Sequence, residues 1–399
     1  MVIGHHNRNH ILPLGQPLAY LLGMDSGQIR AKFRVPVETV EVVPRLWSES
    51  EVLRAMSPRV GEVPRCLADF GAWSLQAYLA GQALADETPK GPVGVGRLSA
   101  LAEFFARLVG VPHDALPHPP SDWPGSGDSI GFLHRLARFT EHQVHLANRP
   151  RFGRLFDAVG VPRDMVSQFL RSVPELTPRP FAFLHTDVHR ANVVVTPTDE
   201  GEQLSVIDWE LTLYGDPLHD LATHLVRMDY DRSEHELMVG LWTDAMREAG
   251  HGDKTAGIDQ DLDHYLGFEY VQSVFPDVMR AALALPDDPA AEDFAQAAER
   301  VCGALGRAWA PLGLKGEPVD ESTAAEAVRE WHEKDRADAT DRGFFGRADR
   351  ARPARAVGRR CPDADHPRGT ARRLRRPQVQ ESAVDVGELL VEGLERHGC

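Results

Sequence analysis

The chain has 399 residues, of which 42% are hydrophobic and 26% charged, a composition typical of globular proteins and large enough for two core-forming units. This composition excludes wholesale disorder. The formal net charge of −15 has the wrong sign for a protein that grips a phosphate backbone, so we expect no nucleic-acid binding. No apolar stretch reaches the roughly 18 residues of a membrane span, and residues 1–9 are polar. We therefore expect a cytoplasmic protein without membrane contact.

The four cysteines lie far apart in the sequence, at positions 66, 302, 361 and 399. No two of them have the C-x-x-C spacing of a zinc or redox site, and their spacing shows no disulfide framework. We expect structural thiols.

Residues 1–79 predict a small antiparallel β lobe that contains one helix. Apolar runs separated by turn residues indicate its strands, at 11–14, 28–35 and 39–43. Ser48 and Glu51 have the spacing of a capping box, and Val52 and Met56 share one helix face. The helix is therefore expected to begin after Ser48.

From Gly96 the apolar period changes to 3.6 residues, which predicts a larger helical lobe over 80–335. The first helix of this lobe ends at Gly110 and Pro112. Further helices are expected at 130–146, 164–173, 218–228, 235–249, 262–285 and 293–309. Three apolar runs too short for helices predict a strand insert, at 181–184, 193–195 and 204–207.

Beyond residue 335 the composition changes abruptly. Residues 341–378 contain twelve arginines against four aspartates, a net charge of +8, with almost no aliphatic periodicity. Such a segment buries too little apolar surface to offset its ordering entropy. We expect 336–399 to be a basic, disordered tail without a part in the activity.

The residues that carry chemistry begin at His185. The pattern H-x-D-x-x-x-x-N, formed by His185, Asp187 and Asn192, lies on a polar loop between two apolar strands, and Asp208 follows the next apolar run. Carboxylate and carboxamide oxygens suit a hard cation such as Mg²⁺. Phosphoryl transfer needs such ligands together with an aspartate that accepts the proton of the attacking hydroxyl. The loop therefore predicts phosphoryl transfer.

This pattern resembles the protein-kinase signature, with Trp209-Glu210 in place of Phe-Gly. It resembles the aminoglycoside phosphotransferase family more closely, whose members share the kinase fold. The family's loop H-G-D-x-H-x-x-N and its motifs I-D-W-E and G-D-P-x-x-D-L-A are matched at 185–192, 207–210 and 215–222. Thr186 stands where the family usually has Gly, and Arg190-Ala191 where it often has Pro-Gly.

The resemblance implies an α+β, protein-kinase-like fold with a small β lobe and a larger helical lobe. It implies that Asp187 is the catalytic base and that Asn192 and Asp208 are Mg²⁺ ligands. His185 is then a scaffold residue of the loop, because Asp187 already fills the role of the base. Asp216 is interpreted as a helix N-cap.

The β lobe of such a fold covers the nucleotide. The turn from Gly4 to Asn7 resembles the family's G-x-x-N turn over the triphosphate, and Tyr78 lies where the family's hinge meets the adenine. ATP or GTP is the implied phosphoryl donor.

A basic residue on the third strand, paired with a glutamate of the next helix, should neutralise the α and β phosphates. We assign Lys32 and Glu49 to this pair, because the family uses about the interval that separates them. Arg45 or Glu51 are the alternatives if the strand register differs, and a solvated strand face is the structural alternative.

The acceptor is predicted from charge. Residues 253–299 contain eleven acids against one lysine and one arginine, a net charge of −9 that would attract a polycation. Solvated helix faces explain the same acids equally well. We expect an antibiotic kinase that acts on an aminoglycoside or related cationic compound, as a monomer or weak dimer. Choline, homoserine, a macrolide or a peptide antibiotic are alternative acceptors, and a catalytically silent kinase-fold binder is the alternative class.

Overall fold

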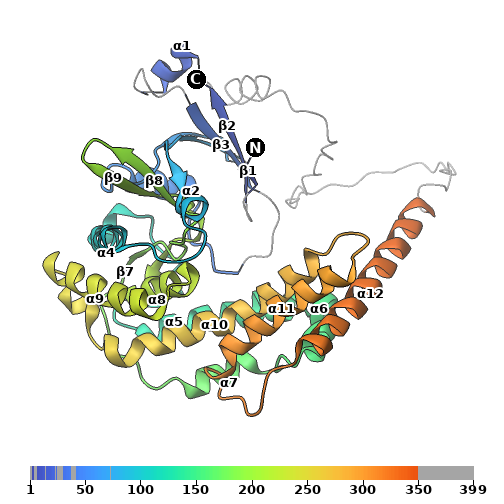
Figure 1. Ribbon diagram of the computed structural model, residues 1–399. Helices are drawn as coiled ribbons and strands as arrows, with labels where there is room; N and C mark the ends of the chain where they lie inside the picture. Colours follow the sequence, from blue (N-terminus) through green and yellow to red (C-terminus); the bar gives the residue numbers. More distant parts are fainter. Residues whose placement is uncertain are drawn as a thin grey trace, which may run out of the picture. The chain divides into compact units, whose positions relative to one another are not determined.

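A five-stranded antiparallel sheet forms the N-terminal lobe (Figure 1). The computed structural model describes residues 2–3, 7–13, 15–22, 24, 30–36, 42–71 and 73–348, and of 2–3, 7–9, 12, 30–36 and 339–348 it describes the backbone only. The strand order is β1-β2-β3-β5-β4. The strands are β1 (Val2–Ile3), β2 (Asn7–Pro13), β3 (Arg30–Pro36), β4 (Cys66–Asp69) and β5 (Ser74–Ala77).

Helix α2 (Glu49–Met56) begins at the capping box that the sequence predicts. Ser48 Oγ accepts a hydrogen bond from Glu51 N at 3.3 Å, and the Glu51 carboxylate accepts one from Ser48 N at 2.9 Å. Val52 and Met56 are fully buried in the main hydrophobic core. The predicted helix is confirmed, and the capping box sets the residue at which it begins.

The N-terminal lobe differs from the prediction at two places. A second helix, α1 (Gln16–Leu21), follows β2 and carries Pro17 in its first turn, where proline is compatible with a helix. The strand expected at 39–43 is wrong at its described end, because Val42 and Val43 form no strand. Val43 is buried in the core instead, and the proline that follows it has no N–H to donate to a sheet. Residues 39–41 lie outside the described residues.

The second lobe is mainly helical, and the helices expected between residues 96 and 309 are present. A π-helical turn over 140–146 continues α5 into α6. Within the described residues, every helix is too short or too polar to cross a membrane. The helices are α3 (Leu84–Glu87), α4 (Val95–Val109), α5 (Ser129–Phe139), α6 (Ala147–Ala158), α7 (Met165–Ser172), α8 (Pro217–Met228), α9 (Arg232–Glu248), α10 (Ile258–Leu283), α11 (Ala291–Trp309) and α12 (Glu321–Ala348).

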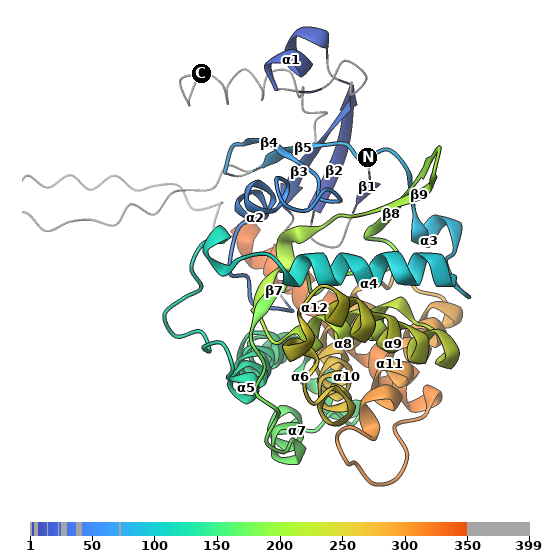
Figure 2. The same ribbon diagram turned by 90° about the vertical axis from the view of Figure 1, so that its left-hand side faces the viewer.

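Short strands sit among these helices, and three of them confirm the predicted insert. Strand β7 (Ala182–Leu184) pairs with β10 (Leu213–Gly215), and β8 (Val193–Thr198) lies between β6 (Gln82–Ala83) and β9 (Gly201–Val206). Figures 1 and 2 show α4 beneath the β8–β9 hairpin, with α9 packed on α4. The insert therefore joins the two lobes and carries the loops that contain the predicted site.

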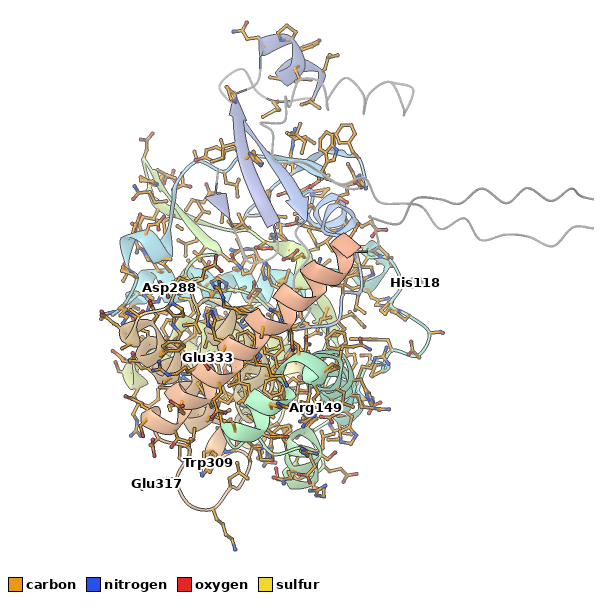
Figure 3. The ribbon with its side chains drawn as sticks, turned by 90° about the vertical axis from the view of Figure 1, so that its right-hand side faces the viewer. His118, Arg149, Asp288, Trp309, Glu317 and Glu333 are labelled. Atoms are coloured by element: carbon orange, nitrogen blue, oxygen red, sulfur yellow. The ribbon has the colours of Figure 1, made fainter. Side chains whose placement is uncertain are left out.

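Helices α6 and α12 were not predicted. Helix α6 contains Pro150 and begins with polar residues, although Phe152, Leu155 and Phe156 have helical spacing in its second half and are buried. Helix α12 is rich in charge, yet Trp331 stacks on Phe152 of α6 with the ring centroids 5.1 Å apart, and Asp335 pairs with Arg151 at 2.8 Å. Figure 3 shows α12 lying across α6. The buried residues Ala324, Ala327, Val328 and Trp331 have helical spacing, but two of them are alanines, so the apolar stripe of α12 is weak in the sequence.

The chain divides into two compact units, residues 1–336 and 337–399. Helix α12 continues to Ala348, so the first part of the basic tail expected at 336–399 is helical. Residues 349–399 lie outside the described residues, and their expected disorder stays a prediction.

A buried arginine connects three segments of the helical lobe. Arg179 is fully buried and donates to both oxygens of Asp216, at 2.9 and 3.0 Å, and to Asp261 Oδ2 at 2.6 Å. Asp216 also caps α8, as expected, by accepting from Leu218 N at 3.0 Å. Asp261 is one of the eleven acids at 253–299 that were expected to attract a polycation, and for this residue the expectation is wrong, because Asp261 neutralises an interior cation at the start of α10.

Replacing Arg179 tests how much this cluster of buried charges contributes to the free energy of unfolding. Arg179→Met should lower the free energy of unfolding by about 3–5 kcal/mol, because it leaves two buried carboxylates without their counter-ion. Arg163→Met is the matched control: its side chain is 76% exposed and bridges Asp157 at the surface, so its loss should cost less than about 1 kcal/mol. Urea denaturation measures both changes, and equal changes in the two variants would contradict this assignment.

Candidate active site

The loop between β7 and β8 is held by one buried carboxylate of α8. The two oxygens of Asp220 accept hydrogen bonds from the backbone N–H groups of His185, at 2.9 Å, and Thr186, at 2.7 Å. Burial raises the pKa of the Asp220 carboxyl to about 7, against the lowering effect of these two hydrogen bonds. The loop geometry is thus fixed at its first two residues.

Thr186 occupies the position where the family usually has glycine, and its backbone explains that preference. Its φ of 59° lies in the left-handed region, which costs little for glycine but strains a β-branched residue. Thr186 Oγ1 donates to the carbonyl oxygen of Leu211 at 2.6 Å. This hydrogen bond compensates in part for the strain, so the departure from the family pattern keeps the loop conformation.

His185 lies behind the loop as a neutral side chain. Its Nδ1 accepts a hydrogen bond from Asp187 N at 3.2 Å, and its ring packs edge-on against Trp209 at 4.5 Å. Burial lowers the pKa of the imidazole to about 4. These contacts are those of a scaffold, and they direct Asp187 away from the core.

Asp187 is 13% exposed, and both of its carboxylate oxygens have partners. Asn192 Nδ2 donates to Asp187 Oδ2 at 2.9 Å and to the Asp187 carbonyl oxygen at 3.0 Å. Arg227, at the end of α8, donates to Oδ1, and His189 Nε2 lies 3.5 Å from the same oxygen. Asp187 is therefore an ordered carboxylate with a limited approach from solvent.

The β8–β9 hairpin brings the two predicted metal ligands together. Val193 pairs with Val206, and Ile207 N donates to the carbonyl oxygen of Asn192 at 2.9 Å, so Asp208 emerges beside Asn192. Asp208 has a φ of 71°, a conformation that aspartate tolerates better than most residues. Because Asn192 commits its Nδ2 to Asp187, its Oδ1 is the atom suited to a cation. Two adjacent oxygen donors fit Mg²⁺.

Glu49 connects the N-terminal lobe to the segment that carries Asp208. Its Oε1 accepts a hydrogen bond from Trp209 N at 3.1 Å, and its Oε2 accepts one from Gln76 Nε2 at 2.9 Å. Gln76 on β5 is the register partner of Lys32 on β3. The sheet therefore places Lys32 opposite the residue that binds Glu49, and the Lys32–Glu49 ion pair itself stays a prediction.

The alternatives for that pair have other partners. The Glu51 carboxylate belongs to the capping box of α2, and Arg45 lies 3.5 Å from the carboxylate of Glu210. Both lie near the start of α2, but neither contact joins β3 to the helix. The observed contacts favour Glu49 as the acidic member.

The remaining nucleotide-covering residues are only partly described. Gly4 lies outside the described residues, and Asn7 begins β2 with only its backbone described. Tyr78 follows β5 directly and is half-buried, on the segment that leads into the helical lobe. The roles of these three residues toward the nucleotide stay predictions.

Arg190 is a loop residue whose role the sequence did not reveal. Its buried guanidinium donates to three carbonyl oxygens, those of Met228 at 2.9 Å, Thr88 at 2.8 Å and Gly91 at 2.8 Å. Arg190 stands where the family often has proline. This departure from the family pattern was the one sign in the sequence that the residue has a role of its own. It anchors the second half of the loop as Asp220 anchors the first.

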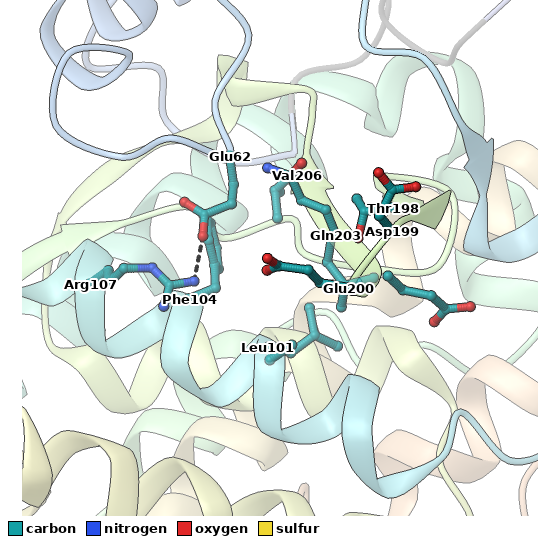
Figure 4. A pocket seen from close by; sticks show the side chains of 12 residues that line it. Glu62, Leu101, Phe104, Arg107, Thr198, Asp199, Glu200, Gln203 and Val206 are labelled. Carbon is teal, nitrogen blue, oxygen red and sulfur yellow. Dashed lines mark hydrogen bonds and ion pairs between the residues drawn. The ribbon is translucent and has the colours of Figure 1, made fainter. Parts of the chain in front are cut away.

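A cavity of about 630 Å³ lies apart from these residues (Figure 4). Leu101 and Phe104 of α4 line its apolar side, and residues 198–206 of the β8–β9 hairpin line another. Arg107 pairs with Glu62 at its edge. Neither the predicted base nor the predicted metal ligands line this cavity, so we assign the active site to the loop and not to the cavity.

Residues 17–250 match the sequence model of the phosphotransferase enzyme family. The match covers more than half of the chain and includes the loop, the β8–β9 hairpin and the start of α8. The chain belongs to this family. The expectation from the sequence motifs is thus confirmed for the family and for the enzyme class, and the phosphotransferase has the kinase-like fold that the resemblance implied.

Solved structures similar to this phosphotransferase share little sequence with it. A putative aminoglycoside phosphotransferase from Ralstonia eutropha is 15% identical, with a TM-score of 0.48, over 82% of this chain and 91% of that chain. An ethanolamine kinase from Plasmodium vivax is 12% identical, with a TM-score of 0.46, over 78% and 80%. A macrolide 2'-phosphotransferase from Brachybacterium faecium is 16% identical, with a TM-score of 0.38, over 68% and 84%. No curated protein matches the chain.

Asp220 offers a test of how the loop is held. Asp220→Ala leaves two buried N–H groups without acceptors, each costing about 1–3 kcal/mol of stability. Phosphotransferase activity should fall with it, because the loop that carries Asp187 loses its anchor. Asp220→Asn keeps one acceptor oxygen and should lie between wild type and Asp220→Ala in urea denaturation. Wild-type stability and activity in Asp220→Ala would refute the anchoring role.

Proposed function

We propose that this phosphotransferase moves the γ-phosphoryl group of ATP or GTP to a hydroxyl group of a small molecule, with Asp187 as the base. The observation that carries the proposal is the arrangement of Asp187, Asn192 and Asp208. The Asp187 carboxylate accepts a hydrogen bond from Asn192, and the backbone bond from Ile207 to Asn192 brings the next residue, Asp208, beside Asn192. Phosphoryl transfer requires this combination.

Each residue has a defined task in the transfer. The acceptor oxygen attacks the γ-phosphorus, its proton passes to Asp187, and the bond from the γ-phosphorus to the bridging oxygen breaks to release the nucleoside diphosphate. Asn192 and Asp208 would hold Mg²⁺, which when bound neutralises phosphate charge. Lys32, positioned by Glu49, would contact the α and β phosphates.

The N-terminal lobe would hold the rest of the nucleotide. The turn from Gly4 to Asn7 would cover the triphosphate, and the segment at Tyr78 would contact the base through backbone groups. These assignments follow the family pattern at matching positions. The lobe would then leave the acceptor side of Asp187 to the helical lobe.

We propose a cationic acceptor, with an aminoglycoside or related antibiotic as the first candidate, and resistance or self-protection as the consequence. Part of the acidic segment supports this, because Asp253, Asp259 and Asp263 are exposed. The buried Asp261 faces Arg179, and buried Glu269 lies by Arg227. Only the exposed acids can attract a polycation. We further propose that the enzyme acts in the cytoplasm as a monomer or weak dimer.

A coupled assay of nucleoside diphosphate release tests the function directly. Aminoglycosides, choline, homoserine and macrolides are screened with ATP and with GTP in the presence of Mg²⁺. The proposal expects acceptor-dependent release with a cationic hydroxyl compound, and an acceptor KM that rises with ionic strength because exposed charges are screened by salt. If an uncharged acceptor is best, the cationic assignment fails and the kinase assignment survives.

Asp187→Ala should reduce kcat by about 10² or more, the usual scale for removal of a general base. Nucleotide affinity should stay within a few-fold, because the proposed ligands of Mg²⁺ remain. Steady-state kinetics and nucleotide titration separate the two effects. A variant with near-normal turnover would remove Asp187 from the role of the base and leave a silent binder or another base to be considered.

Asp208→Ala and Asn192→Ala should both weaken nucleotide binding in Mg²⁺, because each removes one proposed oxygen ligand. Calorimetric titration with ATP, with and without Mg²⁺, measures the metal-dependent part. Asp229→Ala serves as the control, since Asp229 also has positive φ but is the C-cap residue of α8 and not one of the proposed ligands. Wild-type metal dependence in both variants would place the ligands elsewhere.

A further inference from the structure

Arg227 reaches the catalytic carboxylate from the last turn of α8. Its Nη1 donates to Asp187 Oδ1, while Asn192 holds Oδ2. Both oxygens of the proposed base are therefore engaged before any acceptor binds. An acceptor hydroxyl has to donate to one of them, and Asn192 is fixed by its second hydrogen bond to the loop backbone.

A second carboxylate lies within reach of the same guanidinium. Glu269 on α10 is almost fully buried, and its Oε2 lies 3.9 Å from Arg227 Nη2. That separation is about 1 Å longer than a hydrogen bond. The other oxygen of Glu269 accepts from Gln272 Nε2, and His219 Nδ1 lies 3.6 Å from it. Glu269 is thus a buried carboxyl group that its own neighbours hold 3.9 Å from the Arg227 guanidinium.

In this structure the Arg227 guanidinium is hydrogen-bonded to Asp187 and not to Glu269. Burial raises the pKa of the Glu269 carboxyl to about 7, and the Arg227 charge opposes that rise. The Arg227 side chain is 25% exposed, so it lies at the surface of the site and not in the core. One guanidinium therefore has two possible carboxylate partners, one on the loop and one on α10.

We propose that Arg227 guards the catalytic base: it occupies Asp187 Oδ1 while the acceptor site is empty and moves to Glu269 when an acceptor hydroxyl donates to that oxygen. This inference rests on the proposed function, because it takes Asp187 as the base. Arg227 is a positioning residue in this account. Its effect is to discriminate between the acceptor and water.

The discrimination follows from binding energy. A water molecule that attacks the γ-phosphorus would give its proton to Asp187, break the bond to the bridging oxygen, and yield nucleoside diphosphate and inorganic phosphate. Water has few contacts with which to displace a guanidinium from a carboxylate, whereas a bound acceptor has many. Only a ligand with a differential affinity for the two states can shift the equilibrium between them.

The proposed role of Arg227 can be tested without knowledge of the acceptor. The measurement is the rate of ATP hydrolysis in Mg²⁺ without acceptor, monitored as release of inorganic phosphate. Arg227→Met should raise the hydrolysis rate by at least about tenfold, because Oδ1 becomes available to water. Arg227→Lys keeps a donor and should restore low hydrolysis. Arg232→Met is the matched control, because its side chain is 91% exposed on α9. An unchanged or lower rate in Arg227→Met would overturn the proposal.

Two further variants keep the test decisive. Arg227→Met combined with Asp187→Asn should lose the gain in hydrolysis, because the gain depends on the base. Glu269→Gln should raise the acceptor KM and should not raise hydrolysis, because Arg227 then has no second carboxylate. If Arg227→Met does not fold, Glu269→Gln tests the proposal instead. A wild-type acceptor KM in Glu269→Gln would then contradict the proposed movement of Arg227 to Glu269. If instead Asp187→Asn alone retains wild-type phosphoryl transfer to the acceptor, Asp187 is not the base. The proposed function then fails independently of the role of Arg227.

Discussion

Asp220 provides the constraint on which the site depends, since it accepts the backbone N–H groups of two successive loop residues. Those hydrogen bonds fix the left-handed turn at Thr186, which in turn directs Asp187 toward the junction of the lobes. Arg190 closes the other half of the loop on three carbonyl oxygens. The loop thus presents Asp187 from a rigid frame although it has no regular secondary structure, which is the preorganisation that transition-state stabilisation requires.

Shared arginines organise the charges of the helical lobe. Arg179 holds the starts of α8 and α10 through Asp216 and Asp261, and Arg227 stands between Asp187 and Glu269 at the end of α8. Carboxylates that look alike in the sequence therefore have different tasks. Net charge counts them equally, and this is why the acidic segment overstates the attraction for a cation.

The sequence predicted the elements whose signals are local. The capping box of α2, the 3.6-residue periods between 96 and 309 and the apolar runs of the strand insert all depend on neighbours within one turn or strand. Helices α6 and α12 depend on contacts such as Trp331 with Phe152, which are far apart in the chain. The buried residues of both helices have helical spacing, but Pro150 in α6 and the alanines at 324 and 327 in α12 make that local signal weak.

The site shows the same division. The spacing of Asp187, Asn192 and Asp208 follows from the strands that flank them. The residues that the motif groups together therefore also lie close together in the structure. Arg227 and Glu269 could not be predicted, because only the packing of α8 on α10 brings them together. Asp261 was placed wrongly for the same reason, since its partner Arg179 lies on another segment.

A crystal structure of the protein with Mg²⁺ and a β,γ-imido triphosphate analogue would show which residues hold the metal and where the γ-phosphoryl group lies. We expect the metal to be bound by oxygens of Asn192 and Asp208, with Asp187 facing the γ-phosphoryl group without ligating the metal. A metal bound through other residues, or a triphosphate held away from the loop between β7 and β8, would contradict the account.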